Sequence, residues 1–150
     1  MLTIAVDFDG TIVEHEYPRI GAPIPFAIDV LKRLQGEGHT LILWTLREGK
    51  LLQEAIDYCA KQGLEFYAHN ENYPDERLEP NIPRKLSVDI FIDDRNVGGL
   101  LDWGIVYKTI QSGENYISSM DRISDDRPKR KRNWMIRFGE AWEKARGRNY

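Results

Sequence analysis

The residues with the clearest chemical potential stand in one short segment near the N-terminus, Asp7-Phe8-Asp9-Gly10-Thr11. This segment follows an apolar run at residues 2–6, which is typical of a strand buried in a parallel sheet. Residues two apart in an extended chain point to the same side, so the carboxylates of Asp7 and Asp9 project together. Gly10 then permits a sharp turn and a close approach of the backbone to a ligand.

Further polar residues end later apolar runs. Thr45 follows the run at 40–44, Lys85 comes after a long loop, and Asp93-Asp94 follow the run at 88–92. Four carboxylates facing one lysine cannot all stay ionised in a shared cleft without another cation. Hard oxygen ligands select a hard ion, and Mg²⁺ suits them best. Mg²⁺ and a lysine form a receptor for a phosphoryl group, where one acid can attack phosphorus and the other can move protons.

The elements that must position these residues alternate along the chain. Apolar runs at 2–6, 40–44, 64–68, 88–92 and 105–107 predict five strands, and helical spacing at 25–35 and 48–62 predicts two helices between the first three. Residues 69–84, rich in Asn, Pro and Glu, form one long predicted loop. This order indicates an α/β fold with a doubly wound parallel sheet, in which ligands bind at the carboxyl ends of the strands.

The set Asp7-Phe8-Asp9-Gly10-Thr11, Thr45, Lys85 and Asp93-Asp94 resembles the four motifs of the haloacid dehalogenase-like (HAD) hydrolase superfamily, in order and in placement on the strands. The resemblance covers about residues 2–110. It implies an HAD-type Rossmann-like fold in which Asp7 is the nucleophile and forms an aspartyl-phosphate. Asp9 would protonate the leaving oxygen and then activate water, while Thr45 and Lys85 would hold the phosphoryl oxygens. The Mg²⁺ ligands would be the Asp7 carboxylate, the Asp9 backbone carbonyl, and Asp93 or Asp94. A carboxylate at position 9 resembles the motif of the phosphatase and phosphomutase branches of this superfamily.

The spacing between the motifs leaves no room for a cap domain. Residues 12–44 and 46–84 are taken up by a flap, helices, strands and a loop. The protein therefore resembles capless HAD phosphatases, with a single catalytic domain at residues 1–111 and a C-terminal extension at residues 112–150. An open site of this kind accepts a protein phosphate, a nucleic-acid end, or a small molecule enclosed by a neighbouring subunit.

Several residues near the motifs have two interpretations. Arg47 can contact a second anionic group of the substrate, or it is a solvated charge in the first turn of a helix. Thr45 can also cap that helix. Arg84 competes with Lys85 for the lysine position of the motif, which Lys85 matches better in spacing. His15, in the flap, either contacts substrate or lies on the surface.

The C-terminal extension has an unusual charge. Residues 127–150 carry nine basic and two acidic residues, a net charge of +7, whereas residues 1–126 carry 12 basic and 22 acidic residues, a net charge of −10. The basic run at 127–132 precedes a short amphipathic pattern formed by Trp134, Phe138, Ala141, Trp142 and Ala145. We expect this extension to pack on its own domain or to form a homo-oligomer contact, in preference to binding nucleic acid.

Composition places the chain in a broad class. One cysteine, Cys59, excludes an internal disulfide framework, and no window reaches the length of a membrane span. The expected protein is a cytoplasmic, Mg²⁺-dependent phosphomonoester hydrolase that acts on a phosphorylated substrate and does not bind membranes. Its alternatives are a nucleic-acid-end (polynucleotide) phosphatase and a catalytically silent phosphate-binding module.

Overall fold

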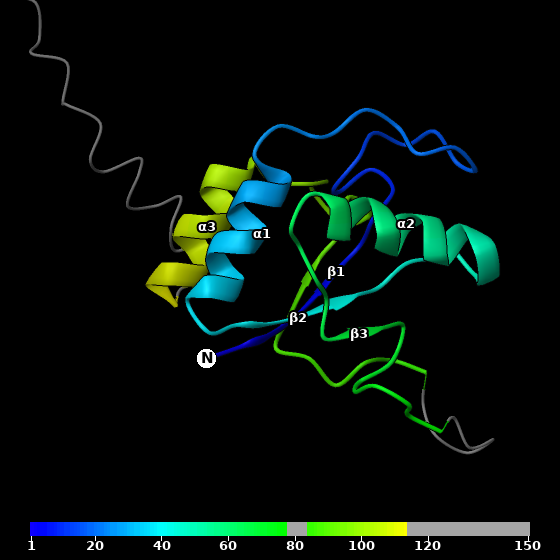
Figure 1. Ribbon diagram of the computed structural model, residues 1–150. Helices are drawn as coiled ribbons and strands as arrows, with labels where there is room; N and C mark the ends of the chain where they lie inside the picture. The colour runs from blue at the N-terminus through cyan, green and yellow to red at the C-terminus, as the bar shows by residue number, and fades with distance from the viewer. Residues whose placement is uncertain (78–83, 114–150) are drawn as a thin grey trace, which may run out of the picture. The chain divides into compact units, whose positions relative to one another are not determined.

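The computed structural model describes residues 1–77 and 84–113 (Figure 1). The chain divides after Gln111 into two units, Met1–Gln111 and Ser112–Tyr150, and only the first two residues of the second unit are described. The basic run at 127–132, the amphipathic pattern and the proposed oligomer contact therefore lie outside the described residues.

The first unit is built on a parallel sheet of four strands. These are β1 (Thr3–Val6), β2 (Thr40–Leu43), β3 (Ala68–His69) and β4 (Ile90–Ile92), in the order β3-β2-β1-β4. Each pair of neighbours is parallel, and Val6 pairs with both Leu43 and Ile92. The predicted α/β fold and parallel sheet are thus confirmed. The strands are shorter than the apolar runs that predicted them.

Three helices accompany the sheet: α1 (Ala27–Gly36), α2 (Gly49–Lys61) and α3 (Trp103–Ser112). The prediction of a strand at 105–107 is wrong, because these residues belong to α3. Trp103, Val106 and Ile110 are buried at spacings of three and four residues, which is the pattern of a helix packed along one face. Within the described residues, no helix is long and apolar enough to cross a membrane.

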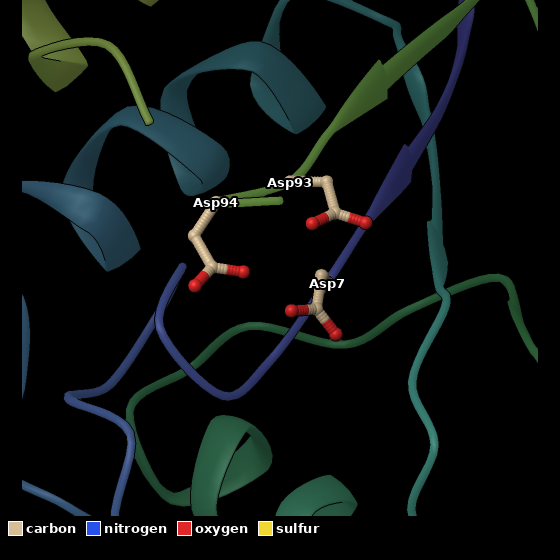
Figure 2. A group of neighbouring side chains, drawn as sticks. All are labelled: Asp7, Asp93 and Asp94. Atoms are coloured by element: carbon tan, nitrogen blue, oxygen red, sulfur yellow. The ribbon is translucent and has the colours of Figure 1, made fainter. Parts of the chain in front are cut away.

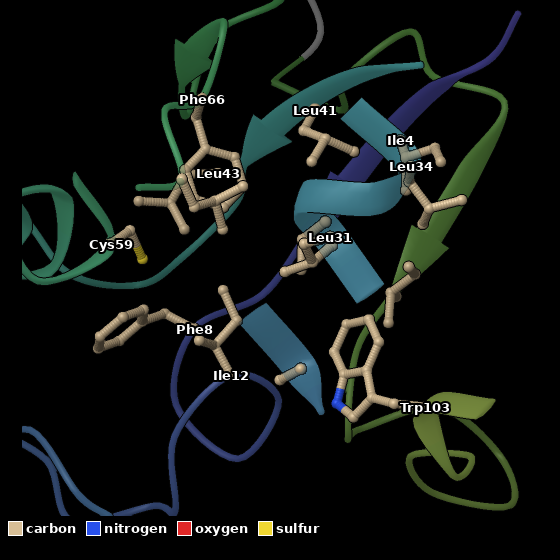
Figure 3. Packing of buried hydrophobic residues seen from close by; sticks show 14 of the residues in the cluster. Ile4, Phe8, Ile12, Leu31, Leu34, Leu41, Leu43, Cys59, Phe66 and Trp103 are labelled. Carbon is tan, nitrogen blue, oxygen red and sulfur yellow. The ribbon is translucent and has the colours of Figure 1, made fainter. Parts of the chain in front are cut away.

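All three helices contribute to one hydrophobic core (Figure 3). On the strands, this core takes alternate residues such as Ile4, Val6, Leu41 and Leu43, which point to one face of the sheet. The opposite face holds a smaller cluster made of Ala5, Ile42, Ala68 and Leu86. In the described part of the chain no helix joins that second cluster, which differs from the helices on both faces expected of a doubly wound sheet.

The topology fixes where a ligand site forms. The chain leaves β1 through α1 to reach β2 on one side, while β4 pairs with the other side of β1. Such a change of direction opens a crevice beyond the carboxyl ends of the two diverging strands. In this chain the crevice lies beyond Val6 and Ile92, where Asp7 and Asp93 follow directly.

Candidate active site

Three carboxylates meet beyond the ends of β1 and β4. Asp7, Asp93 and Asp94 are each half-buried, and each offers one oxygen such that the three atoms lie within 4.8 Å of one another. Figure 2 shows the three side chains directed at a shared space from the two strand ends. One divalent cation with oxygen ligands at about 2.0–2.5 Å can bridge carboxylates at this separation. The structure therefore brings together three of the four acids expected to hold a metal.

Backbone hydrogen bonds hold this arrangement. The Asp7 N–H donates to the Ile92 carbonyl at 3.0 Å, which extends the pairing of β1 with β4 beyond the strand. The Asp94 N–H donates to the Thr11 hydroxyl at 3.1 Å, and the Arg95 N–H donates to the Asp93 carboxylate at 2.7 Å. The acids are thus placed by the sheet and by the two loops that follow it.

The Asp94 carboxylate lies in a tight space and lacks a partner. A Cβ atom on Gly10 would stand 2.4 Å from Asp94 Oδ2, so any side chain at position 10 has to displace the Asp94 carboxylate. Asp94 Oδ1 is buried and accepts no hydrogen bond from any described residue. Buried polar atoms are normally satisfied, and an ionised oxygen left alone is costly. An orphaned carboxylate oxygen beside two further carboxylates fits a bound cation.

The electrostatics at Asp7 are consistent with a cation site among the three carboxylates. Burial raises the pKa of Asp7 from 3.8 to about 7; the Phe8 backbone N–H opposes that rise, and the neighbouring charges of Asp93, Asp94 and Asp9 add to it. A carboxylate surrounded by other acids holds its proton because ionisation adds negative charge to a poorly solvated cluster. A cation in the cluster reverses that effect and favours the ionised form.

Asp9 occupies a different environment. Its two oxygens accept hydrogen bonds from Arg47 Nε and Nη2, both at 2.7 Å, in a bidentate ion pair. Arg47 is 0% exposed and Asp9 is 8% exposed. Both interpretations of Arg47 from the sequence, a substrate contact and a solvated charge, are therefore wrong, because the guanidinium is buried and bonded to protein groups. The Asp9 carboxylate also lies outside the three-acid cluster, in line with the expectation that Asp9 would reach a metal only through its backbone carbonyl.

A short loop after β2 holds Thr45. The Thr45 N–H donates to Asn70 Oδ1 at 2.8 Å, and the Thr45 hydroxyl accepts from the Arg47 N–H at 3.2 Å. Thr45 is not the N-cap of α2, since that position belongs to Glu48. Asn70 is not part of the motifs that the sequence analysis identifies. Its signal was an Asn directly after β3, a residue type that tolerates the left-handed φ of 59° found there.

A cavity of about 760 Å³ opens over these residues. Its lining includes Asp7, Asp9, Thr45 and Asp93, together with the aromatic side chains Tyr17 and Trp44, the cations Arg84 and Arg95, and also His15, Leu46, Glu48 and Asn70. Lys85 does not line it. The Lys85 ammonium lies over the Phe91 ring, 6.0 Å from its centroid, and Arg84 is the residue of that pair on the cavity wall.

Comparison with known proteins gives one informative similarity. The chain matches no protein-family model and no curated protein. A solved structure described as a conserved protein from Bacteroides thetaiotaomicron is 60% identical to it, with a TM-score of 0.73. The match covers 77% of this chain and 94% of that chain.

Proposed function

We propose a function for this chain from the chemistry of its site. The chain belongs to the same family as the conserved Bacteroides thetaiotaomicron protein, and the description of that protein names no activity. The chain is a Mg²⁺-dependent phosphomonoester hydrolase that works through an aspartyl-phosphate, on a capless HAD-type version of its α/β fold. The observation that carries the proposal is the cluster of Asp7, Asp93 and Asp94, with its orphaned Asp94 oxygen. Two of its members, Asp7 and Asp93, line an open cavity.

The metal follows from the donor set. Mg²⁺ would be held by Asp7, Asp93 and Asp94. Its positive charge would offset the negative charge of a phosphoryl group that lies beside a carboxylate nucleophile. Three oxygen donors with no nitrogen or sulfur among them favour a hard ion over zinc or copper. The orphaned oxygen of Asp94 would gain a partner in that arrangement.

Asp7 supplies the nucleophile. One of its oxygens forms a bond to phosphorus while the bond between phosphorus and the ester oxygen breaks. The ester oxygen leaves with a proton from Asp9, which has to take up that proton when the substrate binds, because its carboxylate is ion-paired with Arg47 beforehand. Water then attacks phosphorus, the bond to Asp7 breaks, and Asp9 takes the proton of that water. Inorganic phosphate leaves, and both carboxyl groups return to their starting forms.

Thr45 orients the phosphoryl group. Because its hydroxyl oxygen already accepts the Arg47 N–H, its own proton is free to donate to a phosphoryl oxygen. The second contact is a cation from the segment at residues 84–85, where Arg84 lines the cavity. A guanidinium suits this role because it can donate two parallel hydrogen bonds to one phosphoryl group.

The test is the release of phosphate from an aryl phosphate with Mg²⁺, comparing the wild-type protein with the Asp7→Asn variant. We expect turnover in the wild type and none in Asp7→Asn, since an amide is not a nucleophile toward phosphorus. Asp57→Asn, the same change on the exposed side of α2, is the control and should keep full activity. Phosphate binding without turnover by the wild type would indicate the silent phosphate-binding module and overturn the proposal.

A further inference from the structure

Arg47 is the most completely bonded side chain near the cavity. Its guanidinium donates to both oxygens of Asp9, to the Pro18 carbonyl at 3.0 Å and to the Arg19 carbonyl at 2.8 Å. It also lies against two aromatic rings, 5.1 Å from the Phe8 centroid and 5.4 Å from the Tyr17 centroid. A buried cation with this many partners holds a fixed position.

These contacts join two parts of the cavity wall. Residues 12–24 form a closed loop, the flap, whose base is held by hydrogen bonds from Ile24 N–H to the Ile12 carbonyl at 2.9 Å and from Glu14 N–H to the Ala22 carbonyl at 2.8 Å. The tip of the flap, at Tyr17–Arg19, is bound instead by Arg47. The same guanidinium therefore fixes the tip of the flap and the plane of the Asp9 carboxylate.

We propose that Arg47 is a positioning residue that aligns the Asp9 carboxylate for proton transfer. Because the same guanidinium binds the tip of the flap, this alignment depends on the flap tip staying bound to Arg47. The inference rests on the proposed function, because it assigns a role within that reaction. Each Asp9 oxygen gives one lone pair to Arg47 and keeps another, so the ion pair sets where a proton arrives or leaves. Arg47 itself is fully buried and does not line the cavity.

The chemistry explains why arginine is required at this position. A lysine keeps the positive charge but offers a single nitrogen, which cannot bond both Asp9 oxygens in parallel and also reach two carbonyl groups. The variant Arg47→Lys thus preserves charge balance in the buried site while it releases the plane of the carboxylate and the tip of the flap. A misplacement of about 1 Å in a reacting group can reduce the rate by about 100-fold.

A double-mutant cycle separates positioning from general support of the fold. In the wild-type background, Arg47→Lys should lower kcat by about 10- to 100-fold with KM nearly unchanged. In the Asp9→Asn background, which already lacks proton transfer, Arg47→Lys should lower kcat by less than about twofold. Arg33→Lys, the same exchange in an exposed ion pair with Glu37, is the control and should change neither constant.

A second measurement does not depend on turnover. Hydrogen–deuterium exchange should rise in peptides that cover residues 14–22 of Arg47→Lys and stay at the wild-type level in Arg33→Lys. Equal losses of kcat in both backgrounds, or an unchanged exchange of the flap, would overturn the inference while leaving the phosphatase proposal intact. A wild type without turnover would instead contradict the proposed function. The exchange measurement would then test only whether Arg47 holds the tip of the flap.

Discussion

Replacing Gly10 with alanine should weaken the proposed metal site and leave the fold nearly as stable as in a matched control. The backbone at Gly10 has a φ of +88°, where an L side chain costs about 1–2 kcal/mol of the free energy of unfolding. Gly38 has a φ of +89°, and a Cβ there would meet only the Met1 Cε atom at 3.7 Å, an ordinary contact. Gly38→Ala therefore carries the same backbone strain far from the carboxylates.

The two variants differ in what the new methyl group displaces. At Gly10 it would stand 2.4 Å from Asp94 Oδ2 and 2.7 Å from Asp94 Cγ, so the carboxylate has to move by about 1 Å to reach an ordinary contact. The backbone of Gly10 cannot yield easily, since its N–H donates to the Val13 carbonyl at 2.7 Å. Rotating Asp94 frees the space without breaking any hydrogen bond to its Oδ1 atom, because no described residue makes one.

The consequence is a selective loss of metal binding. Mg²⁺ demands near-ideal octahedral geometry, so we expect the displaced carboxylate to weaken Mg²⁺ affinity by at least about tenfold. At a Mg²⁺ concentration of about 100 times the wild-type Kd, the ion stabilises the wild type and Gly38→Ala by about 2.7 kcal/mol, and Gly10→Ala by about 1.4 kcal/mol or less.

Urea unfolding at pH 7.5, with EDTA and then with Mg²⁺, measures both quantities in each variant. With EDTA the two variants should have similar stabilities, below that of the wild type. With Mg²⁺ they should separate. An equal gain from Mg²⁺ in Gly10→Ala and Gly38→Ala would refute the assignment of Asp94 as a ligand. No gain in the wild type would refute the metal site altogether.

Two further predictions concern stability. The pKa of Asp7 is raised from 3.8 to about 7 in the folded state, so the metal-free folded protein binds the proton more tightly than the unfolded chain does. Its stability should therefore fall between about pH 4 and pH 7, by roughly 1–2 kcal/mol after allowing for the partial exposure of the group, and urea midpoints in EDTA should show a slope that is absent in Asp7→Asn. In the second, Trp103→Phe should lower the free energy of unfolding by about 1–3 kcal/mol, because the buried indole fills the core and donates to the Thr11 carbonyl at 3.3 Å. Tyr107→Phe on the same helix loses only an exposed hydrogen bond to Glu37 and should change the urea midpoint little; equal losses in the two variants would contradict the role given to Trp103.

Much of the site could be predicted because parallel strands bring their carboxyl ends together. The apolar runs before Asp7 and Asp93 identified β1 and β4, and adjacency in the sheet then placed their acids side by side. The same reasoning failed at residues 105–107, where three apolar residues in a row suit a strand and a buried helix equally. The wider spacing of Trp103, Val106 and Ile110 carried the helical signal.

The position of Arg47 could not be read from the sequence. Arginine is rarely buried, so a charged residue after a strand is expected at the surface. Its partner Asp9 lies 38 residues away, and no spacing pattern joins two residues on different elements at that separation. The sequence also could not show which of Arg84 and Lys85 faces the cavity, because adjacent side chains in a loop point in different directions. In the structure Arg84 lines the cavity and Lys85 does not.

The pairing of Arg47 with Asp9 changes the argument for a metal. The sequence set four carboxylates against one lysine and required a cation to balance them all. In the folded protein a buried guanidinium neutralises Asp9, so that carboxylate needs no metal. The unbalanced charge is then confined to Asp7, Asp93 and Asp94, the three whose oxygens lie within 4.8 Å of one another. In the proposed reaction each acid would have the cation that suits its role: the fixed guanidinium of Arg47 beside the proton-transfer group, and an exchangeable divalent ion beside the nucleophile.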